Sequence, residues 1–145
     1  VLDGGPCEAG LESTIVALRG DGGWQMLRPG PISEVALATV LGCPPAPVTV
    51  HAIEAPGQLA SHYAPGKPVR LDAVAAAADE FHIGFGPVAG QVSLSPSGDL
   101  IEAASRLYAL LHRAAADPAP RIAVAPVPDE GVGRAINDRL RRAAA

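Results

Sequence analysis

A stretch of fourteen residues, Glu54 to Lys67, limits how this chain can fold. Its sequence, EAPGQLASHYAPGK, holds two Ala-Pro-Gly turns and has neither helical nor strand periodicity. Proline fixes φ and has no N–H to donate, whereas glycine readily takes positive φ, so the stretch predicts an ordered loop or linker. The 145 residues are enough for a small unit on each side of it. We therefore expect three parts: residues 1–53, a linker at 54–66 and a second unit at 67–145.

The first part, residues 1–53, has the pattern of a β-rich unit. The segments STIVALRG and WQMLRPG predict strands, and GDGG predicts a hairpin-like break between them. Ser33 is a typical N-cap for the helix EVALATVL, which should end at Gly42. The segment VTVHAI offers one more short strand after the Pro-rich CPPAP.

The second unit alternates strand and helix patterns. PVRLDAV, EFHIGFG and QVSLSP predict short strands, and RIAVAPVP predicts a buried one. Between them, Asp99 should cap an amphipathic helix whose apolar positions are Leu100, Ile101, Ala104, Leu107, Tyr108 and Leu111. EGVGRAINDRLRRAAA predicts a last helix with Val132, Ile136 and Leu140 on one stripe. This order predicts a small α/β layer with a parallel sheet.

Composition narrows the class of protein. A net charge of −4 and a pI near 5.5 argue against a dedicated nucleic-acid coat protein. Cys7 and Cys43 are far apart and have no His at ligand spacing, so we expect two ordinary thiols in a reducing cytoplasm rather than a zinc site or a disulfide framework. No apolar run approaches the roughly 20 residues that span a bilayer, and no signal peptide is recognisable, so we expect a cytoplasmic protein.

Three segments hold candidate functional groups, each with a structural alternative. Ser13 and Thr14 follow a glycine-rich turn, where hydroxyls either bind a ligand carboxylate or phosphate or satisfy their own turn. Arg28 precedes a Pro-Gly turn, which suits either a bidentate phosphate contact or a surface position. The glycines of EGVGRAIND suit either anion binding at a helix start or close packing.

Three histidines outside the linker give no indication of a metal site. His51, His82 and His112 are isolated from one another in the sequence, and none makes a ligand pair. We therefore expect no bound metal ion in this chain.

Four motifs, taken in order, resemble one family. They are LDGGPCEAGLESTIVAL, LRPGPIS, APGQLASHYAPGKPVRL and VPDEGVGRAINDRLRRAA, and together they run over essentially the whole chain. The chain closely resembles the long, two-domain form of threonylcarbamoyl-AMP synthase, whose first domain is YrdC-like. The resemblance implies that residues 1–53 are the C-terminal part of a YrdC-like α/β domain, 54–66 a linker or lid, and 67–145 a Rossmann-like accessory α/β domain.

The resemblance also implies a reaction. Such enzymes are nucleotidyltransferases that condense L-threonine, bicarbonate and ATP into L-threonylcarbamoyl-AMP and release pyrophosphate. The product serves the N6-threonylcarbamoyladenosine (t6A) modification of tRNA. The resemblance implies no covalently bound cofactor. ATP is a substrate, and Mg²⁺ is an ion that could accompany it. The implied partners are the rest of the YrdC-like domain, other t6A-pathway proteins and tRNA, with no membrane.

The family pattern assigns roles to five residues of this chain. Ser13 and Thr14 fall where the family binds L-threonine, and Arg28 and Tyr63 fall where it contacts ATP. His62 is a candidate for supporting the lid that carries Tyr63. No residue of this chain is assigned a catalytic role.

The chain departs from the family in ways that affect the expected activity. The Lys-x-Arg and Ser-x-Asn motifs of the catalytic domain are missing, Ala17 stands where the family usually has Asp, and Gln58 stands where Met is common. We therefore expect the C-terminal portion of a longer enzyme, inactive in isolation. The alternatives are a non-catalytic module that binds a nucleotide or a partner, and a regulatory domain that gates the linker.

Overall fold

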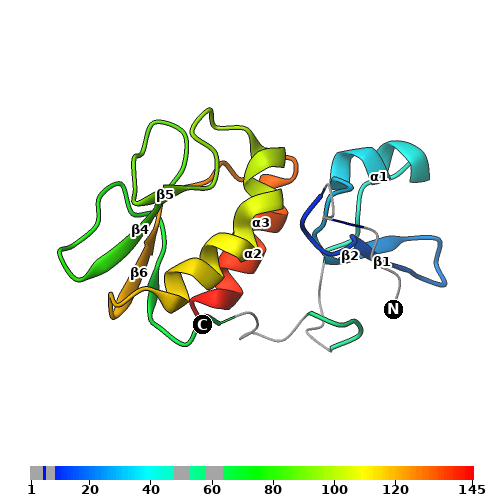
Figure 1. The fold of residues 1–145 in the computed structure, drawn as a ribbon. Helices are drawn as coiled ribbons and strands as arrows, with labels where there is room; N and C mark the ends of the chain where they lie inside the picture. Colours follow the sequence, from blue (N-terminus) through cyan, green and yellow to red (C-terminus); the bar gives the residue numbers. More distant parts are fainter. Residues whose placement is uncertain (1–4, 6–8, 48–52, 58–63) are drawn as a thin grey trace.

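The structure, a computed structural model, describes residue 5 and residues 9–47, 53–57 and 64–145. Figure 1 shows a β-hairpin with one helix on the right and an α/β unit on the left. The helices of the α/β unit lie between its sheet and the hairpin.

The first unit is built on an antiparallel hairpin, as the sequence predicts. β1 (Ile15–Leu18) pairs with β2 (Trp24–Arg28), and the turn between them is closed by the Arg19 N–H donating to the Gly23 carbonyl at 2.8 Å. Trp24 is buried, and its indole N–H donates to the Cys43 carbonyl at 2.9 Å. This bond ties the chain after the first helix back to the hairpin.

The helix of this unit has the predicted ends. α1 (Glu34–Leu41) begins at Ser33, whose hydroxyl accepts from the Ala36 N–H at 3.2 Å. It ends at Gly42, which adopts φ 73° and donates its N–H to the Ala38 carbonyl. The predicted strand VTVHAI lies mostly outside the described residues, and Ile53 at its end is exposed and has no regular structure.

The second unit contains the predicted parallel sheet. Its elements are β3 (Val69–Arg70), β4 (Glu80–Gly84), β5 (Val92–Ser93), α2 (Leu100–Ala116), β6 (Arg121–Val124) and α3 (Gly133–Ala143). The strands lie in the order β3-β6-β4-β5, and every neighbouring pair is parallel. The chain thus returns after α2 to insert β6 between β3 and β4.

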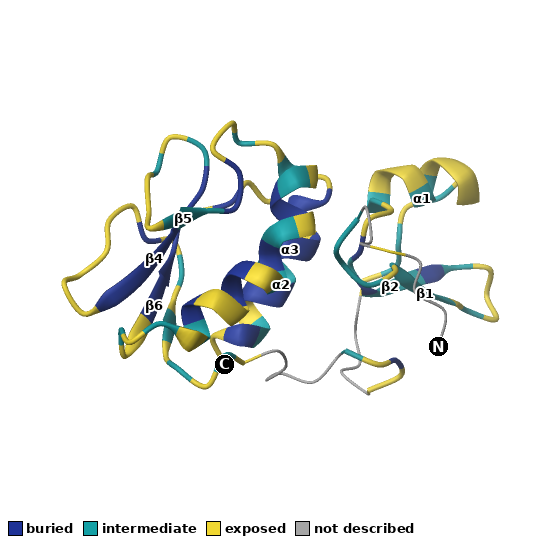
Figure 2. Ribbon diagram, viewed as in Figure 1, coloured by how far each residue is buried: buried dark blue, intermediate teal, exposed yellow. Residues whose placement is uncertain are grey.

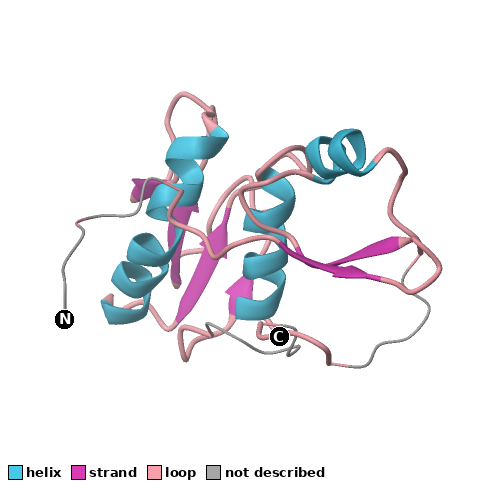
Figure 3. Cartoon of the chain, turned by 90° about the vertical axis from the view of Figure 1, so that its right-hand side faces the viewer, coloured by secondary structure: helices cyan, strands magenta, loops and turns pink. Residues whose placement is uncertain are grey.

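α2 and α3 pack side by side on one face of this sheet (Figures 1 and 3). The core between the two layers combines β4 and β6 with the inner faces of both helices, and includes Phe81, Ile83, Leu107, Ile122, Val124, Ile136 and Leu140. The loop after β3 crosses the opposite face, where the His82 ring nitrogen Nε2 lies 3.0 Å from the Ala73 carbonyl oxygen. The unit is therefore a two-layer α/β fold.

The long helix α2 follows the predicted pattern with one exception. Asp99 caps it, with one carboxylate oxygen accepting from the N–H groups of Ile101 and Glu102 at 2.7 and 2.9 Å. The prediction that Ile101 joins the apolar stripe is wrong, because this side chain is 62% exposed. Six positions separate it from the buried Leu107, which places it about 120° away around the helix.

The first unit leaves many apolar side chains in solvent. α1 has no buried residue, and Figure 2 shows it as exposed with some positions of intermediate burial. Of the eight exposed large apolar side chains in the described part of the chain, six belong to this unit: Leu18, Ile32, Val35, Val40, Leu41 and Ile53. Among the described residues, no helix is long and apolar enough to cross a membrane.

Candidate functional site

Two of the residues predicted to bind substrates lie together at the open end of the hairpin. Arg28 is the last residue of β2, and its side chain is 8% exposed. Its Nε and Nη2 groups donate to the Ser13 carbonyl at 3.1 and 3.0 Å, and Nη2 lies 3.4 Å from the Ser13 hydroxyl. The guanidinium fork therefore fixes the backbone of Ser13, and Ser13 is still exposed to solvent.

The start of the linker is part of the same arrangement. The Nη1 group of Arg28 donates to the Pro56 carbonyl at 3.3 Å. A guanidinium has five N–H donors, and described residues accept from four of them here, so among these residues one N–H on Nη1 remains for a ligand. At the turn end of the hairpin, Arg19 forms a two-pronged ion pair with Glu54, with both N–O distances 2.8 Å. Two arginines of the hairpin thus hold the chain where the linker begins.

Thr14 has local partners. Its hydroxyl donates to the Ile32 carbonyl at 2.8 Å and accepts from the Ile32 N–H at 3.1 Å. The turn that it binds is tightly packed, since a Cβ added at Gly30 would lie 2.3 Å from the Thr14 nitrogen. This is the structural alternative that the sequence left open, and a threonine contact by Thr14 stays a prediction.

Tyr63 and His62 lie outside the described residues, so their predicted roles in ATP binding and lid support stay predictions. The linker is next described at Ala64 and Pro65, which line a cavity of about 200 Å³ together with Tyr108, Leu111 and His112 of α2. Just beyond, Lys67, the one lysine of the chain, donates to the carbonyls of Ala114 and Asp117. The described ends of the linker thus lie at the Arg28 site and at α2.

A second cluster joins the two units beside Ser13, and sequence reasoning did not find it. Arg139 of α3 is 1% exposed; its Nε donates to a Glu12 carboxylate oxygen at 2.8 Å, and its Nη2 donates to the Pro29 carbonyl at 3.0 Å. The Tyr108 hydroxyl of α2 lies 3.0 and 2.9 Å from the two oxygens of the same carboxylate. We call Glu12, Tyr108 and Arg139 the interdomain latch.

The latch is electrostatically well matched. Burial acts to lower the pKa of the Arg139 guanidinium, but its hydrogen bond to Glu12 and the negative charge of that carboxylate outweigh this effect, so the pKa is raised. Arg139 also contacts Asp138 on its own helix. The guanidinium is therefore charged at all ordinary pH values and holds residues on both sides of the Ser13–Arg28 pair.

The residues just before Ser13 also pack on the α/β unit. Gly10 lies so close to α2 that an added Cβ would approach the Ser105 Cα to 2.3 Å. Leu11 packs against the core of the α/β unit. Each residue from Gly10 to Thr14 is thus held by a helix, the core, Arg28 of β2 or a neighbouring turn. Since Gly10, Leu11 and Glu12 contact the α/β unit, α2 and α3 help to set the position of Ser13.

The latch had almost no signal in the sequence. Glu12 and Arg139 are 127 positions apart, and nothing in either local pattern indicates a partner. Their one shared property is that each lies inside a motif, GLEST and INDRL respectively, on which the family resemblance rests.

Within the described residues, no three His, Cys, Asp or Glu side chains converge as metal ligands. His82 is buried against Ala73, and His112 is exposed on α2. Close packing, one of the two alternatives for the glycines of EGVGRAIND, holds at Gly133, where an added Cβ would lie 2.0 Å from the Pro128 carbonyl oxygen.

Comparison with known proteins identifies the chain. Its fold matches a crystal structure of P. abyssi Sua5 complexed with L-threonine, with a TM-score of 0.77 and 24% sequence identity. The match covers 98% of this chain and 48% of the other, so the chain spans about half the length of that protein. No curated protein matches the chain. Residues 32–145 match the family described as threonylcarbamoyl-AMP synthase, C-terminal domain. The chain therefore belongs to the threonylcarbamoyl-AMP synthase C-terminal domain family.

Proposed function

We propose that this chain is the C-terminal portion of an L-threonylcarbamoyladenylate synthase. The whole enzyme would make threonylcarbamoyl-AMP from L-threonine, bicarbonate and ATP, in the cytoplasm, for the t6A modification of tRNA. Family membership supports the proposal, and the observation that carries it is the pairing of Ser13 with Arg28 at the entrance to the linker. The structural neighbour is a Sua5 protein complexed with L-threonine, which supports threonine as a substrate here.

In this proposal the described residues position substrates and neutralise charge. The exposed Ser13 hydroxyl is a donor for threonine, and the N–H of Arg28 Nη1 that has no partner among the described residues is a donor for an ATP phosphate oxygen. The amine of threonine attacks the carbon of bicarbonate and forms a carbamate as water leaves; a carbamate oxygen then bonds to the α-phosphorus, and the bond from that phosphorus to pyrophosphate breaks. Holding these groups together supplies much of the rate enhancement. Mg²⁺ would enter bound to the ATP phosphates.

The exposed apolar side chains of the first unit support its assignment to a larger domain. Leu18, Val35 and Val40 are each more than 70% exposed, which is unusual for a folded unit that stands alone. We propose that residues 1–53 are the C-terminal part of a YrdC-like domain, whose remainder covers this face. That remainder would supply the Lys-x-Arg and Ser-x-Asn motifs that these 145 residues lack.

The linker fits the role of a lid. It begins beside Arg28, through the Pro56 contact, and its described residues resume against α2. The span between carries Tyr63, which would present its ring and hydroxyl to the nucleotide. The two Ala-Pro-Gly turns reduce the entropy lost when such a segment closes.

Pyrophosphate release tests the proposal. The full-length protein should release pyrophosphate from ATP only when both threonine and bicarbonate are present, whereas the 145-residue chain alone should release none. Ser13→Ala in the full-length protein should raise the KM for threonine more than that for ATP. Robust turnover by the isolated chain, or pyrophosphate release from ATP that does not depend on threonine, would contradict the proposal.

A further inference from the structure

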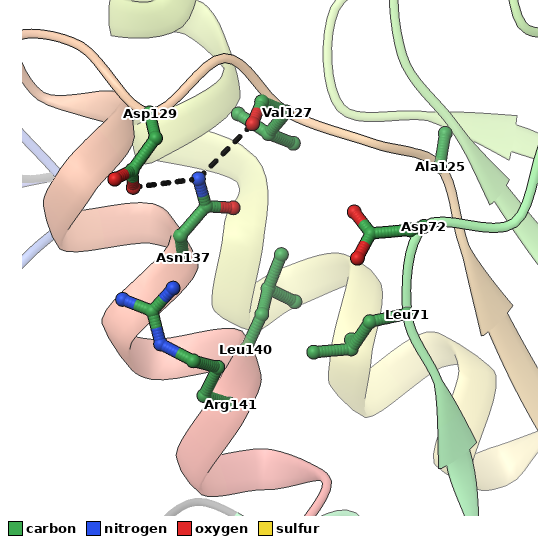
Figure 4. A pocket seen from close by; sticks show the side chains of 8 residues that line it. All are labelled: Leu71, Asp72, Ala125, Val127, Asp129, Asn137, Leu140 and Arg141. Carbon is green, nitrogen blue, oxygen red and sulfur yellow. Dashed lines mark hydrogen bonds between the residues drawn. The ribbon is translucent and has the colours of Figure 1, made fainter.

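A cavity of about 340 Å³ lies in the α/β unit, away from the Ser13–Arg28 site. Figure 4 shows it between the loop after β3, the segment after β6 and one side of α3. Leu71 and Asp72 directly follow β3, and Ala125 directly follows β6. The cavity is therefore at the carboxyl ends of two neighbouring parallel strands.

The topology explains why space opens there. The chain leaving β3 crosses one face of the sheet, where Ala73 contacts His82, whereas the chain leaving β6 crosses to the other face and becomes α3. Two neighbouring strands whose connections depart to opposite faces leave a crevice beyond their carboxyl ends. In open α/β sheets this crevice is where ligands bind.

The polar groups of the cavity are mainly hydrogen-bond acceptors. The Asn137 amide donates to the Val127 carbonyl and the Asp129 carboxylate at 3.0 and 3.1 Å, which fixes its orientation and turns its oxygen inward. The Asp72 carboxylate points at that oxygen from the opposite wall (Figure 4). Asp72 adopts a positive φ of 54°, which is uncommon for a residue other than glycine. Two facing acceptors leave room for a group that donates several hydrogens.

The charges narrow the ligand further. Two carboxylates, Asp72 and Asp129, and one guanidinium, Arg141, line the cavity, which favours a cationic donor such as a primary ammonium. Leu71 and Leu140 supply an apolar wall. Arg141 lies one turn after Asn137 on α3, where its guanidinium can bind an anionic group. A molecule with an ammonium at one end, a carboxylate at the other and little bulk between them matches this lining.

We propose that this cavity binds a small free amino acid, with its ammonium between Asp72 and Asn137 and its carboxylate at Arg141. The site is separate from the substrate site proposed above and does not depend on it. It gives the α/β unit a ligand of its own, whose binding bridges the loop after β3 and α3. Because α3 also carries Arg139 of the interdomain latch, the ligand would stabilise the helix that holds the Ser13 segment.

The side-chain amide of Asn137, the single asparagine of the chain, reports ligand binding directly in an NMR spectrum. Asn137 and the three glutamines give the side-chain amide signals in a ¹⁵N–¹H spectrum, so the Asn137 signal can be assigned by an Asn137→Asp variant. L-Alanine should shift this signal saturably. Ethylamine should shift it with weaker affinity, whereas propionate, which lacks the ammonium, should not shift it.

Variants separate the two ends of the ligand. Asp72→Asn should weaken alanine binding about tenfold, and Arg141→Gln should weaken alanine but not ethylamine. Asp79→Asn, which removes a charge at the far end of the same loop, and Ser13→Ala should both leave alanine binding unchanged. An Asn137 signal that stays fixed up to about 10 mM alanine, or that responds to adenosine instead, would overturn the proposal. Equal affinities in the parent and Asp72→Asn would overturn it as well.

Discussion

Arg139 joins the two units through a buried guanidinium. It is almost completely buried, and its fork joins the Glu12 carboxylate to the Pro29 carbonyl. A second arginine of α3, Arg134, also reaches the first unit, through a 3.1 Å contact with Glu34, but the two side chains of that pair are 50% and 36% exposed. The two arginines therefore form a matched comparison of buried and exposed contacts between the same units.

Arg139→Gln should lower the free energy of unfolding by about 2 to 3 kcal/mol, since it leaves a partly buried carboxylate without its cation. Arg134→Gln should cost less than about 1 kcal/mol, as is typical of exposed pairs. Urea unfolding of both variants measures the difference. Equal losses would show that Arg139 contributes no more than a surface contact.

Glu80 should make stability depend on acid pH. The Arg70 guanidinium and the Ala77 N–H both bond to its carboxylate and lower its pKa from 4.5 to about 2. Because the folded-state pKa is the lower one, the stabilisation is complete above pH 4.5 and is lost as the pH falls towards 2. Glu80→Gln should flatten the decline of unfolding free energy across this window, and the exposed Glu130→Gln should not. Parallel pH profiles for parent and Glu80→Gln would contradict this.

At single positions, sequence reasoning reached the residues but not their partners. Ser13 and Arg28 were singled out from separate motifs, and the structure brings them together. That the partner of Arg28 is a backbone carbonyl could not be foreseen, because a guanidinium in a sequence carries no information about which distant carbonyl it will face. Glu12 and Arg139 were not found from the sequence at all, because only the packed units bring them into contact.

The two capped helices should respond differently to loss of their caps. Asp99→Ala removes two hydrogen bonds at the start of α2, a helix with six buried side chains, and should cost about 1 kcal/mol of global stability. Ser33→Ala removes the equivalent bond from α1, which buries none, so it should fray that helix without changing the unfolding midpoint. Hydrogen exchange and urea unfolding together measure both effects. A shifted midpoint for Ser33→Ala would show that α1 is coupled to the core.

Elements that depend on local signals were predictable, and their arrangement was only partly so. Ser33, Gly42 and Asp99 are caps, and each acts within its own turn of helix, so both helices were located from sequence. Alternating strands and helices predicted a parallel sheet, which is confirmed. The insertion of β6 between β3 and β4 was not predicted, because strand order depends on contacts between distant segments. β3 and β5, with two residues each, were too short for their ends to be located.

The contact between the two units should be sensitive to one methyl group. Gly10 has φ 61° and leaves no space for a Cβ beside Ser105, whereas Gly22 has φ 85° and faces open space. Both Gly→Ala changes strain the backbone, so their difference isolates the clash. Gly10→Ala should speed proteolysis between the units and increase the radius of gyration by X-ray scattering, and Gly22→Ala should do neither. Identical behaviour of the two variants would contradict the close approach.

In the molecule as a whole, the α/β unit fixes the two segments of the first unit that carry Ser13 and Arg28. α2 and α3 lie between the sheet and the hairpin (Figure 1), and they hold residues 10–12 and Pro29 through the latch and the close approach of Gly10. The Ser13–Arg28 pair lies between these fixed points. A domain without an assigned catalytic residue would in this way still control threonine binding.

The threonine KM of the full-length enzyme carrying Arg139→Lys tests this claim most directly. Lysine keeps the charge beside Glu12 but lacks the fork that also reaches Pro29, so folding should be retained while Ser13 is displaced. We predict that the KM for threonine in pyrophosphate release rises about fivefold to tenfold with little change in kcat, and that Arg134→Lys stays within about twofold of the parent. An unchanged threonine KM in Arg139→Lys would mean that the latch joins the two units without positioning Ser13. It would contradict the claim that the α/β unit controls threonine binding.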